Sequence, residues 1–183
     1  MTQLERQQRG LLNLIKNRGG PPEDSYLRQV ANSRGLEMVR EIAVWWRAFQ
    51  IEDQCRFTSR LLKRCECFEE VVVTYFNNHR TSPFIEELSQ DFLRSLRDHH
   101  HDGLIRAVSE FELALLQVRV GSVECFQVLW DRNPEKVILA LEESSELPPP
   151  EIGCLYRMRI GRDLPRMVVC TRESMASSPR PQT

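Results

Sequence analysis

Few side chains in this chain of 183 residues have types and spacing suited to chemistry. The histidines at 99–101 suggest a metal site, but three adjacent residues at a helix end point in different directions and cannot converge on one ion. The Cys-Glu-Cys segment at 65–67 lacks the two-residue spacer of zinc and redox motifs, and no second Cys/His pair lies at ligand spacing. We therefore expect no metal and no cofactor bound by this chain itself.

The carboxylates give little more support for catalysis. Asp91, Glu110 and Glu112 are scattered and have no partnered histidine, so a general acid/base pair is a weak interpretation. The sequence also has no glycine-rich phosphate-binding loop. These absences do not exclude catalysis, but they favour a binding module with no catalytic residues over a self-sufficient enzyme.

Composition limits the class of protein further. The formal net charge of −1 gives no global field that would attract phosphate, so nucleic acid is not a favoured partner. No apolar run is long enough to cross a bilayer and the first residues lack the core of a signal peptide, so we expect a cytoplasmic protein without a membrane partner. Six cysteines do not make a dense disulfide framework in a chain of this size, which favours reduced thiols.

The C-terminal third predicts a strand, a helix and a hairpin. Alternating apolar residues predict strands at 124–130, 154–160 and 166–172. Asn133 followed by Pro134 is typical of a helix start, and this helix should run to about Ser144. The last strand then lies at an edge of the sheet, where free N–H and C=O groups could accept an extended peptide as an added strand.

The rest of the chain reads as helix. Ser82 is expected to cap one helix, with Pro83 at its first position. The fold class is therefore α+β, mainly α: an N-terminal helical bundle (1–121), a small winged-helix-like α/β module with a C-terminal hairpin (122–173), and a disordered tail (174–183). Helices are expected at 4–17, 25–32 and 36–65, then over segments that end near 79, 98 and 121.

The helix expected at 36–65 has a wide apolar face that should make it central to the fold. Trp45 and Trp46 lie on or beside this face, and a third tryptophan, Trp130, lies in the first strand. We interpret all three as core residues first. An exposed tryptophan would instead indicate a hot spot for docking another protein.

Three short segments occur in a recognisable succession: Phe68 to Phe76, Ser82 to Ile85 followed by Phe92-Leu93, and Phe111 to Leu115. Over roughly Leu61 to Arg172 this succession resembles the HvfC/TglI-type proteins. They are often labelled DNA-binding, but serve as partner subunits of multinuclear non-haem iron enzymes that modify cysteines in ribosomally made peptides. The chain departs from the family pattern at Leu113, where an aromatic residue is frequent.

The resemblance implies a non-catalytic subunit that forms a heterodimer with a barrel-shaped iron oxidase and leaves the iron to that partner. It would bind the leader of a precursor peptide and present a downstream cysteine to the iron. The implied product lacks the β-carbon of a C-terminal cysteine, as in 3-thiaglutamate biosynthesis. The alternatives are oxazolone and thioamide formation of the methanobactin type, or a winged-helix DNA-binding regulator.

We assign peptide capture to the last strand and to the helix at 134–143. For the apolar candidates the alternative is a place in the core, since a short helix beside a hairpin must bury something. For the arginines, with Arg157 and Arg159, the alternative to attracting an acidic peptide is an ordinary solvated face. The candidate peptide-binding residues are Val137, Leu141, Arg166, Val168, Cys170 and Arg172.

The other two function classes make distinct demands on the same residues. A DNA-binding regulator needs a basic recognition face, which Glu135, Glu142 and Glu143 on the candidate helix oppose. A stand-alone enzyme needs a pocket with convergent polar groups, and turnover by the isolated chain.

Overall fold

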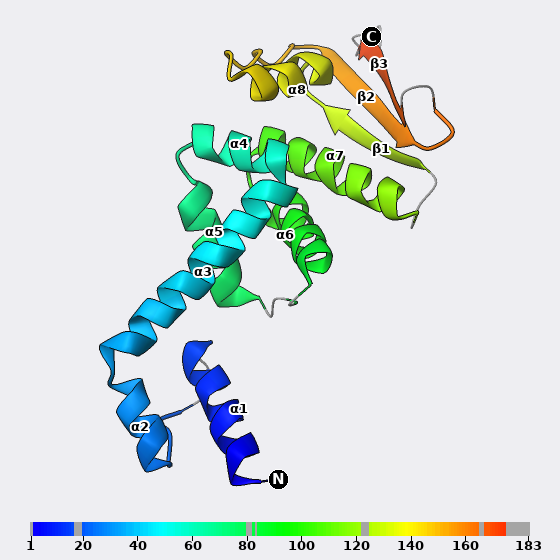
Figure 1. The fold of residues 1–183 in the computed structure, drawn as a ribbon. Helices are drawn as coiled ribbons and strands as arrows, with labels where there is room; N and C mark the ends of the chain where they lie inside the picture. The colour runs from blue at the N-terminus through cyan, green and yellow to red at the C-terminus, as the bar shows by residue number, and fades with distance from the viewer. Residues whose placement is uncertain are drawn as a thin grey trace, which may run out of the picture. The chain divides into compact units, whose positions relative to one another are not determined.

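The computed structural model describes residues 2–16, 20–79, 82, 84–121, 125–164 and 167–174. Over these residues the chain is mainly helical with one small antiparallel sheet, which confirms the predicted α+β class (Figure 1). The helices are α1 (Gln3–Ile15), α2 (Ser25–Ala31), α3 (Arg34–Gln54), α4 (Arg56–Arg64), α5 (Phe68–Asn78), α6 (Ile85–His99), α7 (Gly103–Val120) and α8 (Pro134–Glu143). The strands are β1 (Cys125–Trp130), β2 (Cys154–Gly161) and β3 (Val168–Ser174).

The chain forms two compact units, Met1–Phe49 and Gln50–Thr183. The expected domain boundary at 121/122 falls inside the second unit, where α7 packs against β1 and β2. Residues 175–183 of the expected tail lie outside the described part of the chain. Among the described residues, no helix has both the length and the apolar character needed to cross a bilayer.

The first unit contains α1, α2 and most of α3. Thr2 and Glu5 form a capping box at the start of α1, which satisfies two backbone N–H groups that the helix leaves without a partner. The Arg40 guanidinium of α3 donates to the Leu14 carbonyl at the end of α1 through Nε (2.9 Å) and a terminal nitrogen (2.6 Å). A charged donor at a helix C-terminus is favourable because that end carries partial negative charge.

The second unit has a continuous apolar core. α7 packs against α6 and α4, and it also contacts β1 and β2 of the sheet. Trp130 of β1 is 1% exposed and its ring meets Phe111 of α7 edge to face at 6.1 Å, so the interpretation of this tryptophan as core is confirmed. Burial on this scale of an aromatic side chain fixes the sheet on the helices.

The strand, helix and hairpin predicted for the C-terminal third are confirmed. The strands pair in the order β1-β2-β3, antiparallel throughout, and β2 is the central strand (Figure 1). Asn133 caps α8 as expected, since its side chain accepts from the N–H groups of Glu135 and Lys136 and Pro134 follows it. The C-terminal module was readable because its turn residues and period-two alternation agree.

The prediction of a single helix at 36–65 is wrong. The chain breaks at Cys55 and continues as α4 in a new direction. Cys55 gives no side-chain cap, and the first N–H groups of α4 are satisfied by Glu112 from α7, whose oxygens each lie 2.9 Å from the N–H nitrogens of Phe57 and Thr58. The sequence has no glycine or proline that would signal this break. The start of α4 depends instead on Glu112, which lies 55 positions from Phe57 along the chain.

The cap predicted for the helix after Ser82 is also shifted. The N-cap of α6 is Phe84, and the Ser82 hydroxyl accepts from the Phe84 N–H (3.2 Å) without capping α6 itself. Pro83, expected at the first helical position, lies outside the described residues. Glu86 and Glu87 lie in the first turn of α6, where acidic side chains are favoured.

Candidate functional site

The candidate binding edge is β3, which is one of the two outer strands of the sheet. It pairs with β2 on one side, and within the described residues no strand pairs with its other side. A strand side without such a partner is where a further strand can be added. Alternate residues of β3 lie opposite buried residues of β2, so one face of the strand continues the inner face of the sheet. The inner-face pairs are Ile160 with Val168, Met158 with Cys170 and Tyr156 with Arg172.

The inner face of β3 is partly open. Val168 and Cys170 are half-buried and Arg172 is exposed, whereas the β2 residues opposite them are buried. Burial raises the pKa of the Cys170 thiol, and the carboxylate of Glu135 in the first turn of α8 adds to this, so the start of α8 is electrostatically coupled to this part of β3. A half-buried apolar row beside an open strand edge can take up the alternate side chains of an extended peptide.

Of the other candidate peptide-binding residues, two lie in the core and one lies outside the described part of the chain. Val137 and Leu141 are each 0% exposed, so both are core residues that hold α8 in place, which is the alternative that the sequence left open. Because α8 is short and has few apolar residues, it needs the most apolar of them to pack into the core. Arg166 lies outside the described residues.

The arginines of the hairpin are partly engaged within the protein. Arg157 forms a two-pronged ion pair with Glu173 across the strands (2.8 and 3.0 Å). Arg172 lies 3.1 Å from the Glu151 carboxylate and over the ring of Tyr156. Exposed pairs of this kind contribute little to stability and exchange readily with other anions, so Arg172 can still contact an acidic peptide.

Two arginines of α4 position α8, although no sequence motif marks them. Arg60 donates to the carbonyls of Leu141 (3.0 Å) and Glu142 (3.2 Å), and Arg64 donates to those of Ala140 and Ser145 (both 2.7 Å). These carbonyls lie at the C-terminal end of α8, where cations are favoured. The only sequence signal was a basic helix with a strongly one-sided apolar face.

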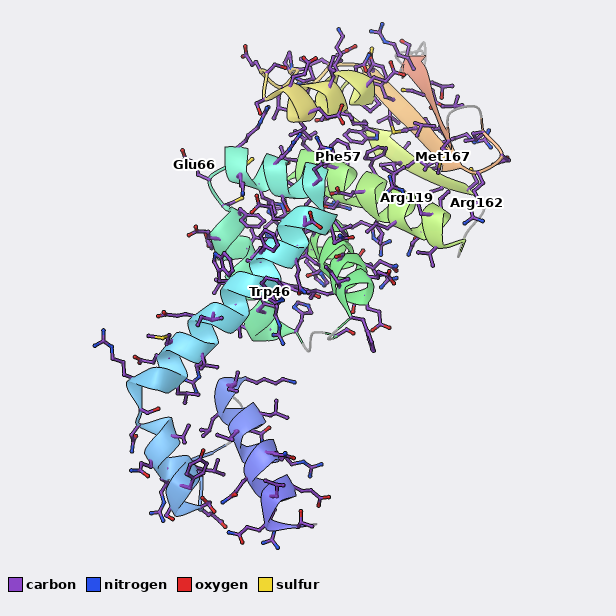
Figure 2. The ribbon with its side chains drawn as sticks, viewed as in Figure 1. Trp46, Phe57, Glu66, Arg119, Arg162 and Met167 are labelled. Carbon is purple, nitrogen blue, oxygen red and sulfur yellow. The ribbon has the colours of Figure 1, made fainter. Side chains whose placement is uncertain are left out.

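A third arginine fixes the hairpin to α7. Arg162, in the turn between β2 and β3, donates to the carbonyls of Val118 (2.7 Å) and Arg119 (2.8 Å) at the end of α7 (Figure 2). Gly121 caps α7 with φ 81°, and a Cβ there would lie 3.0 Å from the Arg162 guanidinium. The glycine is thus required both for the left-handed turn and for the arginine to approach.

The histidines at 99–101 belong to no cluster of possible metal ligands in the described part of the chain. Within the described residues, no group of three or more His, Cys, Asp or Glu side chains is placed to hold an ion. His100 instead accepts a hydrogen bond from the Asp102 N–H (3.1 Å), beside the cap that Asp102 provides for α7. The six cysteines are all described and all free, and Cys65 is exposed.

No family model, no curated protein and no solved structure matches this chain.

The apolar face of α3 was expected to lie in the core, but it is exposed. Trp45 is 65% exposed and Trp46, which Figure 2 labels, is 53% exposed, so the interpretation of both as core residues is wrong. Their rings stack on or tilt against Phe49 and each other at centroid distances of 5.8 to 6.5 Å. Apolar spacing alone cannot tell a core-facing helix from one that presents its apolar side to a partner. We call this surface the α3 aromatic face; its exposed members are Met38, Val39, Ile42, Trp45, Trp46 and Phe49.

The turn between α4 and α5 holds a strained residue. Glu66 has φ 55°, and the N–H groups of Glu66 and Cys67 donate to the carbonyls of Lys63 (3.1 Å) and Leu62 (3.0 Å). This is the hydrogen-bond pattern in which glycine usually occupies the left-handed position. Figure 2 labels Glu66 at this turn.

We expect the Glu66→Gly variant to be more stable than the natural protein by about 0.5–1 kcal/mol, because glycine adopts the left-handed conformation without the Cβ clash. Chemical denaturation followed by circular dichroism measures this difference. Glu66→Ala keeps the clash and serves as the control. If both variants change the midpoint equally, backbone strain at residue 66 is not the cause.

Proposed function

We propose that this protein is a non-catalytic peptide-binding subunit that captures the leader of a ribosomally made precursor peptide along β3 and presents a downstream cysteine to a separate multinuclear iron oxidase. The observation that carries this proposal is the outer edge of β3 with the half-buried residues Val168 and Cys170 on its inner face. The resemblance to HvfC/TglI-type proteins supplies the iron partner and the cysteine chemistry. Excision of the β-carbon at a C-terminal cysteine is the reaction that we favour.

The chemistry of the edge supports a peptide as the ligand. Backbone groups of β3 supply hydrogen bonds that any extended chain can use, and the inner-face row selects its alternate side chains. Binding the remote leader raises the effective concentration of the cysteine at the iron, so an inactive subunit can accelerate the reaction. α8 presents Glu135, Glu142 and Glu143 on its exposed surface, and these carboxylates would repel the phosphates of DNA.

The decisive experiment is co-expression with the neighbouring genes, followed by affinity capture of this protein and iron analysis. We expect an iron enzyme and a short peptide from the same operon to be captured together. Recovery of this protein alone, with neither partner bound, would reject the proposal. A captured DNA duplex with steeply salt-dependent affinity would favour the regulator instead.

The role of β3 is tested by two matched variants. Val168 and Val169 are adjacent, half-buried and identical in type, but Val168 lies on the inner face and Val169 on the outer face. We expect Val168→Asp to weaken leader binding about tenfold or more, because a carboxylate replaces apolar contact with the peptide. Val169→Asp should change the Kd less than about threefold.

Fluorescence anisotropy of a labelled leader peptide measures both constants, and circular dichroism verifies that each variant keeps its strands. Equal losses in the two variants would mean that the inner face does not read the peptide. A further variant, Arg172→Glu, should weaken the binding of acidic leader peptides and leave the binding of other leader peptides unchanged.

A further inference from the structure

A pocket of about 700 Å³ lies between α5 and α6, remote in sequence from the sheet edge. Its floor is apolar and aromatic: Tyr75, Phe92 and Leu96 are buried, and the rings of Tyr75 and Phe92 meet edge to face at 5.2 Å. Burial raises the pKa of Tyr75 to about 12, so the floor is uncharged near neutral pH. Concave sites with an apolar floor and a few polar groups at the rim are the usual form of small-ligand sites.

Two imidazoles at the rim have fixed tautomers. The Nδ1 atoms of His79 and His99 each lie 3.1 Å from a backbone carbonyl oxygen four residues earlier, and a carbonyl can only accept. In the neutral form of either ring Nδ1 therefore carries the proton, and the Nε2 lone pair is the one that can face a ligand. The His79 ring also stacks on Tyr75 at 4.7 Å, which extends the aromatic wall.

The ionisable side chains of this pocket include a carboxylate. Glu70 contributes it to the wall, and no lysine or arginine lies among the lining residues that the structure describes. The lining runs along α5 from its first turn, where Glu70 lies, to its last turn, and it includes the last turn of α6. Hydrogen-bond acceptors, an anion and aromatic faces thus meet around one cavity.

We propose that this pocket binds an organic cation of the guanidinium or ammonium class, with its apolar part on the aromatic floor and its N–H groups directed to acceptors at the rim, Glu70 among them. Cations are attracted to aromatic faces, and N–H donors match the acceptors at the rim. An anion would meet the Glu70 carboxylate and the negative faces of the aromatic rings, which is unfavourable. The cation can be a free amine or a basic side chain of a polypeptide, and the site is independent of the peptide edge at β3.

The test uses three probes of one shape and different charge: benzamidinium, neutral benzamide and anionic benzoate. Each is titrated into the full-length ¹⁵N-labelled protein, and amide chemical shifts near Glu70, His79 and His99 report binding. We expect benzamidinium to bind with a Kd of about 1 mM or below and benzoate to leave these shifts unchanged. Stronger binding of benzoate, or no binding of benzamidinium, overturns the proposal.

A matched pair of variants tests the contact. Glu70→Gln removes the carboxylate from the pocket wall, whereas Glu69→Gln removes an exposed neighbouring carboxylate outside it. We expect the first to weaken benzamidinium about threefold to tenfold and the second to have no such effect. Equal effects would mean general surface charge and reject the site. Comparing agmatine with an acetylated, amidated arginine tripeptide then distinguishes a free amine from a polypeptide side chain.

Discussion

Replacing Glu112 by alanine should lower the free energy of unfolding of the second unit by about 3 kcal/mol or more. The carboxylate is 5% exposed and accepts from two backbone N–H groups at the start of α4. Removal leaves the buried N–H of Thr58 and the part-buried N–H of Phe57 without a partner and opens a cavity between α4 and α7. α4 carries the arginines that hold α8, so the loss should also loosen the helix beside β3.

Urea denaturation followed by circular dichroism measures the loss, and Glu69→Ala is the control because Glu69 is exposed in the first turn of α5. The control should stay within about 0.5 kcal/mol of the natural protein. A Glu112→Ala variant that unfolds at the same urea concentration as the control would show that α4 starts without this cap.

Glu112 also predicts a pH dependence. Burial raises the pKa of this carboxyl above its ordinary 4.5, and the backbone hydrogen bonds at Phe57 and Thr58 oppose the shift without cancelling it. A carboxyl with a raised pKa in the folded state contributes stability that is full below the unfolded pKa and is lost as pH rises through the folded pKa.

The difference in unfolding free energy between the natural protein and Glu112→Gln should therefore shrink as the pH rises above about 4, because glutamine does not titrate. Other groups titrate equally in both proteins and cancel. A difference that grows with pH would mean that the hydrogen bonds outweigh burial and lower the pKa.

Local signals in the sequence were sufficient for part of this fold. Asn133-Pro134 marks a helix start and Gly121 marks a helix end whatever surrounds them, because capping and left-handed turns depend on adjacent residues. The hairpin followed from period-two alternation in the same way. These elements also placed β3 at the edge before any tertiary contact was considered.

The failures have tertiary causes. The break at Cys55 depends on a carboxylate from α7, and the placement of α8 depends on Arg60 and Arg64 of α4. Val137 and Leu141 have the apolar types that a groove needs, but types alone do not give burial. The pocket between α5 and α6 was missed because its histidines were judged as metal ligands along one helix, whereas their acceptor role depends on backbone carbonyls and on a second helix.

The second large effect is expected at the α3 aromatic face. If this face docks the iron enzyme that we propose as partner, the double variant Trp45→Ala/Trp46→Ala should weaken capture of that enzyme at least about thirtyfold. Large exposed aromatic side chains lose much water-accessible apolar area on docking, and they carry a disproportionate share of interface energy. Alanine is the best helix former, so α3 itself should persist.

Tyr26→Ala is the matched control, since Tyr26 is an exposed aromatic residue of α2 in the same compact unit. Affinity capture of the enzyme at several protein concentrations gives the loss for each variant, and the unfolding free energy is measured in parallel. Unchanged capture, or a large fall in stability of the tryptophan variant, would remove α3 as the docking surface.

The peptide edge at β3 and the α3 aromatic face can be tested separately because they belong to different compact units. Val168→Asp should impair leader binding and leave enzyme capture intact, whereas the tryptophan variant should do the reverse. Loss of both activities in either variant would contradict two independent surfaces. Mixing the two variants with enzyme and leader adds a stringent test: if delivery needs both contacts on one molecule, neither variant should restore cysteine modification to the other, because the leader and the iron would then be held by different chains.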